Sequence, residues 1–159
     1  MPRKTTKSLE RKVNPDRKYQ SILVQRLINK SMLDGKKQAA ERAVYAAIEG
    51  AAKKLKSENP VEVLEKAIAN VSPDFEVKSR RVGGANYQIP FPIAGHRQLH
   101  FAFSWLVQAA RARQGMPYAK RLEAEIVDAC NETGAAFKKK EDCHRMAEAN
   151  RAFAHFARA

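Results

Sequence analysis

The sequence lacks the features that mark membrane-spanning and disulfide-bonded proteins. None of its apolar runs approaches the roughly 20 residues needed to cross a bilayer. It has two cysteines, Cys130 and Cys143, which do not form a C-x-x-C pair. We expect both to be reduced and to act as small apolar side chains, because a basic intracellular protein of this size needs no disulfide. No membrane partner is expected.

Acidic residues are scarce. The 159 residues include 17 Asp and Glu against 30 Lys and Arg, a formal net charge of +13. A charge of this size repels itself unless a polyanion neutralises it. The composition therefore favours an acidic partner in water.

One internal segment has no acidic residue at all. Between Glu76 and Glu123 lie 46 residues without Asp or Glu, and they include eight cations: Lys78, Arg80, Arg81, Arg97, Arg111, Arg113, Lys120 and Arg121. Ordinary helix surfaces intersperse both signs of charge. The segment predicts a surface that binds a polyanion, and the alternative is a merely solvated basic face.

Arrangements that could support catalysis are missing too. Glu123 and Glu125 would project about 200° apart on a helix, too far for a paired acid and base. His96 and His100 have a spacing that could share a metal, but no further ligands follow at familiar spacings. We interpret these histidines as polar surface or RNA-facing groups. We expect no catalytic residue, no metal and no cofactor, and hence no enzyme.

The chain divides into a short arm and one domain. Residues 1–18 are polar and basic, so we expect an arm that becomes ordered on its partner. Residues 19–159 are predicted to form a single helical RNA-binding domain. Apolar spacings of three and four predict six helices: from Tyr19 to near Met32, around residues 40–55, from Asn59 to Pro73, from Gly95 to Gly115, around residues 122–130, and after Lys140. Asn59 is the predicted N-cap of the third helix, with Pro60 at its first position.

Residues 75–91 switch to strand-like alternation and predict a β-hairpin. The expected faces have Phe75 and Val77 on one side and Glu76, Lys78 and Arg80 on the other. Gly83 and Gly84 supply the turn. Pro90 and Pro92 exclude the second strand from the interior of a sheet. The predicted fold class is therefore mainly α: a six-helix bundle-like body with a protruding two-stranded β-hairpin and a basic N-terminal arm.

Two basic clusters suit phosphate binding. Lys78, Arg80 and Arg81 lie just before the glycine tip, where a backbone can approach a phosphate closely. Tyr87 offers a surface for an unpaired base, although a packed cross-strand aromatic is the more ordinary interpretation.

Lys36 and Lys37 form the second cluster. They follow Gly35 at a helix start, where the helix dipole disfavours cations unless an anion is bound there as well. The remaining glycines of a nucleotide-binding P-loop are absent.

Three blocks of sequence resemble one known family. The first block contains Pro15, Asp16, Tyr19, Ser21, Val24, Ile28, Asn29, Met32, Asp34, Gly35, Lys36 and Lys37. The second block runs from Glu76 to Gly84 and continues with Tyr87, Gln88, Ile89 and Pro90. The third block contains Lys138, Glu141, Asp142, the residues from His144 to Asn150, and those from Phe153 to His155. In this order and spacing they resemble the S-seven family of small-subunit ribosomal proteins. One departure is the arginine-poor stretch from Phe91 to His96, which puts family contacts there in doubt.

The resemblance implies a role in the ribosome. It implies a structural constituent of the small subunit that binds the three-prime major (head) domain of small-subunit rRNA, initiates head assembly and lies near the exit-site tRNA and the mRNA path. The implied neighbours include other small-subunit proteins, among them S-eleven. The implied location is the cytoplasm, in the small ribosomal subunit, and an organellar ribosome stays open.

The resemblance and the charge pattern together give candidate contact residues. The expected rRNA-binding residues are Arg3, Lys4, Lys7, Arg11, Lys12, Lys18, Lys30, Lys36, Lys37, Arg97, Arg111, Arg113, Lys138, Lys139 and Lys140. The expected hairpin residues near tRNA and mRNA are Lys78, Arg80, Arg81, Gly83, Gly84 and Tyr87. The alternative function is a basic, architectural DNA-binding protein, since net charge does not distinguish the two polymers.

Overall fold

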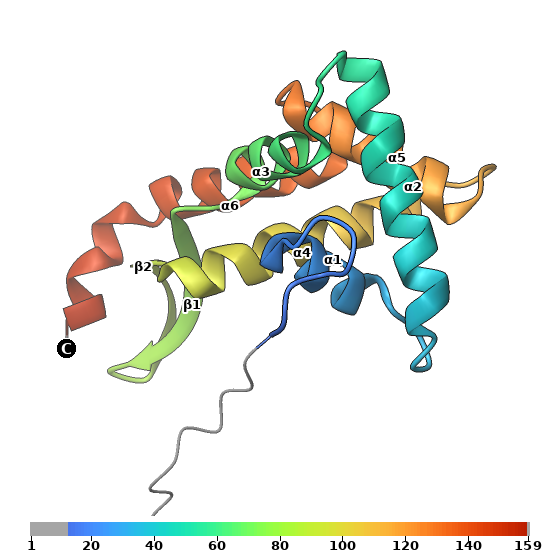
Figure 1. Ribbon diagram of the computed structural model, residues 1–159. Coiled ribbons are helices and arrows are strands. Elements are labelled where there is room, and N and C mark those ends of the chain that lie inside the picture. Colours follow the sequence, from blue (N-terminus) through green and yellow to red (C-terminus); the bar gives the residue numbers. More distant parts are fainter. Residues whose placement is uncertain (1–12, 159) are drawn as a thin grey trace, which may run out of the picture.

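The computed structural model describes residues 13–158 and shows a helical body from which one β-hairpin projects (Figure 1). Its elements are α1 (Ile22–Ser31), α2 (Lys37–Leu55), α3 (Pro60–Val71), β1 (Phe75–Val82), β2 (Ala85–Pro92), α4 (Gly95–Ala112), α5 (Tyr118–Cys130), α6 (Gly134–Ala149) and the 3₁₀ helix η1 (Arg151–Arg158). The predicted mainly α class with a two-stranded hairpin is confirmed. The arm residues 1–12 lie outside the described part.

Local capping explains where the first helices begin. The Ser21 side chain accepts a hydrogen bond from the Val24 N–H at the start of α1. The Asn59 side chain accepts one from the Val61 N–H at 3.1 Å, with Pro60 at the first position of α3, as predicted.

The last helix begins earlier than predicted. It was expected after Lys140, but α6 starts at Gly134 and ends at Ala149. Gly134 has φ +90°, and the Ala136 N–H in the first turn donates to the buried Glu125 carboxylate at 2.8 Å. A partner 11 residues away in sequence therefore supports this helix start, and no local pattern revealed it. Phe153, expected in the same helix, lies in η1.

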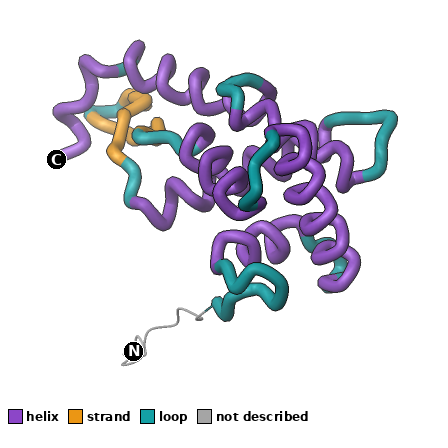
Figure 2. The backbone as a smooth tube through the Cα atoms, turned by 45° about the horizontal axis from the view of Figure 1, so that its top comes forward, coloured by secondary structure: helices purple, strands orange, loops and turns teal. Residues whose placement is uncertain are grey.

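The core lies where α5 packs against α2, α3 and α4. Figure 2 shows the helices gathered into one body with the strands at one end of it. Its fully buried side chains include Leu27, Ile28, Ile48, Leu64, Leu106, Leu122 and Ile126. Two glutamates of α5, Glu123 and Glu125, are buried beside them, at 2% and 0% exposure. None of the helices in the described residues is long and apolar enough to cross a membrane.

The hairpin is a two-stranded antiparallel sheet with Val82 opposite Ala85 across the Gly83–Gly84 turn. The predicted alternation did not say which face is buried, and at the base of β1 it is the face of Glu76. Phe75 is 46% exposed, whereas Glu76 is 6% exposed. Glu76 faces inward because Arg97 of α4 binds both of its carboxylate oxygens, at 2.9 and 2.8 Å. Figure 1 shows the hairpin and η1 at the end of the body away from α2.

Candidate nucleic-acid interface

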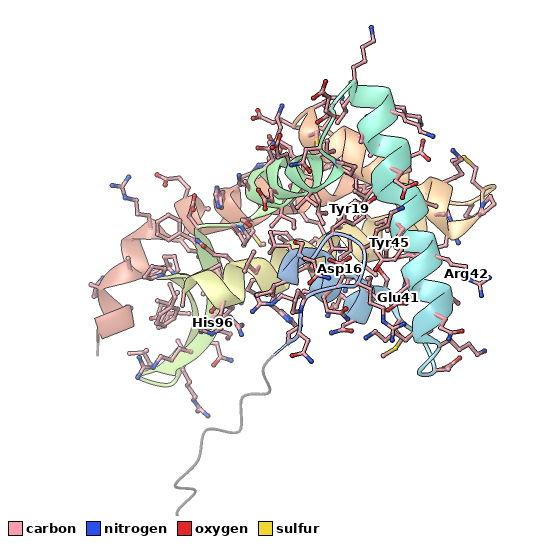
Figure 3. All side chains as sticks on the ribbon, viewed as in Figure 1. Asp16, Tyr19, Glu41, Arg42, Tyr45 and His96 are labelled. Atoms are coloured by element: carbon pink, nitrogen blue, oxygen red, sulfur yellow. The ribbon has the colours of Figure 1, made fainter. Side chains whose placement is uncertain are left out.

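Three hollows surround α1 and form the surface that we call the α1 face. The first has a volume of about 360 Å³ between α1 and α4, and its lining includes Arg26, Lys30, His96 and His100. Figure 3 shows His96 at the start of α4, toward the hairpin. This hollow confirms that the two histidines lie on the surface.

The second and third hollows continue the α1 face on its other sides. Arg17 and Lys37 line the second, together with Val13, the first described residue. Lys36, Arg111 and Arg121 line the third. Asn29 of α1 lines both the first and the second hollow, so the two are adjacent.

The charges that line the α1 face are almost all positive. Its three hollows are lined by seven Lys and Arg residues and by one carboxylate, that of Glu41. The pairs made by Lys36 with Asp34 and by Lys37 with Glu41 are loose, at 3.9 Å each. Exposed pairs of this kind contribute little, so these cations stay available to an anion.

Asp16 fixes the chain at the edge of the α1 face. Its buried carboxylate accepts hydrogen bonds from the N–H groups of Lys18, Tyr19 and Ser21 at 2.8–3.0 Å and from the Tyr45 hydroxyl at 3.2 Å (Figure 3). Burial acts to raise the pKa of Asp16, but these hydrogen bonds outweigh it and hold the pKa below its ordinary value. The chain that leads to the predicted arm is therefore anchored to α2.

Lys18, a predicted rRNA contact, is engaged within the protein. It forms an ion pair with Glu49, and its Nζ lies 5.5 Å from the Tyr19 ring centroid and 5.7 Å from that of Tyr45. The hydrogen bond from Lys18 lowers the pKa of Glu49. Lys18 thus adds to the anchor around Asp16.

Several cations of the acid-poor segment are paired with carboxylates from outside it. Arg113 donates to Glu125 at 2.8 Å and pairs with Asp128, while Lys120 pairs with Glu123 at 2.9 Å. Burial acts to lower the pKa of Arg113, but its carboxylate partners outweigh it and raise the pKa. Folding therefore brings carboxylates of α5 next to cations of the acid-free segment, and these cations are partly neutralised within the protein.

The predicted residues Arg97 and Lys78 meet at one carboxylate. Besides the two bonds from Arg97, Glu76 pairs with Lys78 at 2.7 Å. Burial acts to raise the pKa of Glu76, but these two cations lower it below its ordinary value. Arg97 therefore ties the base of the hairpin to α4, while Lys78 pairs with Glu76 within β1.

At the hairpin tip the cations are more exposed. Arg80 donates to the Phe156 carbonyl oxygen of η1 at 3.3 Å, and Arg81 is exposed. Gly83 and Gly84 both have positive φ, +58° and +92°, and a Cβ at either would meet open space. The backbone of the tip is thus accessible to a large partner.

Tyr87 packs within the protein. Its ring centroid lies 5.1 Å from that of Phe153 and 5.5 Å from that of Phe156. These contacts hold η1 against β2. Tyr87 is therefore packed, but against η1 and not across the strands, where its partner is Arg80.

Lys138, Lys139 and Lys140 lie within α6, whereas they were expected to precede the last helix. Lys139 donates to Gln108 at 3.0 Å and Lys140 to the Asn70 carbonyl at 2.8 Å. Lys138 is exposed.

The α1 face also includes cations that were not predicted as contacts. Arg26 is one turn before Lys30 on α1, a spacing of four that could have revealed it. Arg17 had no such signal, because its position depends on the Asp16 anchor. Arg121 belongs to the acid-free segment noted in the sequence, but its place beside α1 depends on the α4–α5 junction. In the described residues, no group of three His, Cys, Asp or Glu side chains could hold a metal ion.

Comparison with known proteins shows the family. The sequence profile described as "Ribosomal protein S7p/S5e" matches residues 2–151. The chain belongs to this family.

Bacterial relatives match over nearly the whole chain. A protein of Dictyoglomus thermophilum is 56% identical over 146 residues, which cover 92% of this chain and 93% of the relative. One of Thermomicrobium roseum is 53% identical over 156 residues, covering 98% and 99%. One of Hydrogenobaculum is 56% identical over 160 residues, covering 98% and 99%. Each is named small ribosomal subunit protein uS7. Members of the S7p/S5e family are structural proteins of the ribosome and not enzymes, as the sequence predicted.

Proposed function

We propose that this chain is a structural constituent of the small ribosomal subunit, and that its α1 face binds the three-prime major domain of small-subunit rRNA. The observation that supports this most directly is the charge of that face, where seven cations and one carboxylate line three hollows. Lys and Arg side chains that neutralise phosphates supply most of the affinity for nucleic acid. By binding early, the chain would initiate assembly of the subunit head.

The predicted contacts of the N-terminal arm fit the same orientation. The Asp16 anchor places Val13 at the edge of the α1 face. The arm cations Arg3, Lys4, Lys7, Arg11 and Lys12 precede Val13 in the sequence and would extend the contact along the RNA.

The hairpin serves a different partner in this proposal. Its tip, with Arg81 and the two glycines, would lie beside the exit-site tRNA and the mRNA path, with small-subunit proteins such as S-eleven nearby. Support comes from the accessible backbone at Gly83 and Gly84 and from the position of the hairpin at the end of the body away from α2 (Figure 1).

Competition binding tests the proposal against the alternative of an architectural DNA-binding protein. The probes are a folded transcript of the rRNA head domain and a DNA duplex with the same number of phosphates. We expect the transcript to displace the duplex at a concentration at least about 100 times lower, because specific sites exceed non-specific binding by about a thousandfold or more. Equal competition by the duplex would favour the alternative. Co-sedimentation of tagged protein with small subunits, and not with large subunits, is the cellular counterpart.

A further inference from the structure

The third hollow of the α1 face differs from the other two because its floor is apolar. It has a volume of about 500 Å³ between α1, the start of α2 and the α4–α5 junction, and we call it the Arg121 pocket. Leu33, Ala39, Ala43 and Tyr118 are among its lining residues. Leu33 is 59% exposed, so its side chain is accessible to a ligand in the pocket.

Three cations surround this apolar floor, and no carboxylate lines the pocket. Two of them are held in place by hydrogen bonds. Arg111 donates to the Ser31 carbonyl at 3.3 Å, and Arg121 donates to the Arg111 and Arg113 carbonyls at 3.1 and 2.7 Å. The third cation, Lys36, precedes the first residue of α2.

Arg121 keeps donors that the protein does not use. Its Nε is buried and is the one such side-chain atom, in the described part of the chain, without a hydrogen-bond partner. Buried polar groups are rarely left unpaired without a functional reason.

Tyr118 supplies an aromatic surface beside these cations. Its hydroxyl donates to Ser31 Oγ at 2.9 Å, and the Arg121 guanidinium carbon lies 6.0 Å from its ring centroid. The phenol is thus fixed by α1 while its ring lines the pocket.

From this arrangement we infer that the Arg121 pocket takes one unstacked nucleotide of the bound RNA, with its base on the apolar floor and its phosphate on Lys36, Arg111 and Arg121. The volume falls in the range of pockets for small ligands. Proteins that recognise RNA specifically do so mostly through unpaired bases placed on apolar or aromatic surfaces. The inference rests on the proposed function and adds to it a site that selects an irregular RNA structure over a duplex.

The decisive variant fills the floor without changing any charge. Ala43→Leu places a larger side chain in the pocket, and leucine keeps the helix propensity of α2 high. Its matched control is Ala46→Leu, an exposed position of the same helix that does not line the pocket. We expect Ala43→Leu to weaken binding of the rRNA transcript about tenfold or more, as loss of one stacked base does, and Ala46→Leu to change it less than twofold.

The salt dependence of the affinity distinguishes base binding in the pocket from general electrostatic attraction between cations and phosphates. The log–log slope of affinity against salt should be unchanged in Ala43→Leu, because no cation is lost. Lys36→Gln should reduce the magnitude of the slope by about 0.7 to 0.9. Circular dichroism of each variant establishes that the helices are intact. Leu33→Asn, at an exposed loop position, is a second variant that should weaken binding in the same direction at little cost to the fold.

Photo-crosslinking identifies the occupant directly. With p-benzoylphenylalanine in place of Leu33, we expect a crosslink to rRNA in assembled small subunits. A crosslink to a protein would overturn the inference and indicate an acidic peptide in the pocket. Wild-type affinity in both Ala43→Leu and Leu33→Asn would overturn it as well. If the unchanged chain failed to bind the transcript, the proposed function itself would be wrong, and the inference with it.

Discussion

Gly50 lies in the middle of α2, directly against the Glu123 carboxylate of α5. A Cβ at this position would be 2.3 Å from Glu123 Oε2 and 2.5 Å from its carboxyl carbon. The carboxylate cannot move away freely, because Lys54 and Lys120 each hold it at 2.9 Å. Glycine is therefore required for α2 and α5 to pack with the buried Glu123 carboxylate between them.

This contact predicts that replacing Gly50 by alanine lowers the stability of the protein, which is opposite to the usual effect in a helix. Gly→Ala within a helix ordinarily stabilises by about 0.5–1 kcal/mol. We expect Gly50→Ala to destabilise by about 1–3 kcal/mol, because it forces the buried carboxylate to shift. Urea unfolding measures this, with Gly95→Ala as the control, since a Cβ there has no neighbour nearer than 4.0 Å. In a Glu123→Ala background, Gly50→Ala should become neutral or stabilising. A destabilisation that persists there would contradict the steric account.

Asp16 predicts a dependence of stability on pH. Its pKa is lower in the folded state than its ordinary value of 3.8, so its charge stabilises the fold above that value, and this stabilisation is lost as pH falls through the folded-state pKa. We expect Asp16→Asn to lower the free energy of unfolding by about 2 kcal/mol at pH 7. The difference between wild type and variant should shrink below about pH 4. Urea unfolding at pH 7 and at pH 3 measures it, and an equal difference at both would show that the carboxylate charge does not matter.

At the scale of elements, the hairpin and the start of α2 are expected to have separate partners. Replacing Lys78, Arg80 and Arg81 together by alanine should largely preserve incorporation into small subunits, because all three side chains lie outside the core and Arg97 still pairs with Glu76 when Lys78 is removed. It should change the occupancy of tRNA at the exit site. Alanine at Lys36 and Lys37 should instead weaken incorporation.

Both sets of variants are compared at matched salt by sedimentation and by exit-site tRNA retention. If the hairpin variant failed to assemble while the Lys36 and Lys37 variant assembled normally, the proposed division would be reversed. The Glu76–Arg97 pair is kept in the hairpin variant, so we expect the base of the hairpin to stay attached to α4. A loss of assembly would then not be due to a detached hairpin.

The elements that sequence could predict are those that depend on local chemistry. Asn59 with Pro60 starts α3, and Gly83 with Gly84 turns the hairpin, because each needs only its neighbours in the chain. The start of α6 could not be predicted, since its support comes from Glu125 of α5. The inward position of Glu76 was missed because it depends on Arg97, 21 residues away. Arg113 was expected to be free for RNA, but it closes an ion-pair network with α5 instead.

At the scale of the whole molecule, charge is distributed unevenly over the surface. The α1 face has one carboxylate among its lining residues, whereas α3 and the residue before its cap expose Glu58, Glu62 and Glu65. None of these three forms a salt bridge within the described residues. Figure 1 shows α3 above α1 in the body. A polyanion is therefore expected on the α1 face and not over α3.

One pair of charge-matched variants tests this orientation most directly. Arg26→Gln with Lys30→Gln removes two cations from the α1 face, and Lys56→Gln with Lys66→Gln removes two exposed cations at the end of α2 and on α3. The measurement is the log–log slope of affinity for the rRNA transcript against salt. The first variant should bind more weakly and lose about 1.4 to 1.8 from the magnitude of the slope, while the second should keep the wild-type slope. Equal losses in the two variants would show that net charge alone drives binding, and would contradict a specific RNA-binding face around α1.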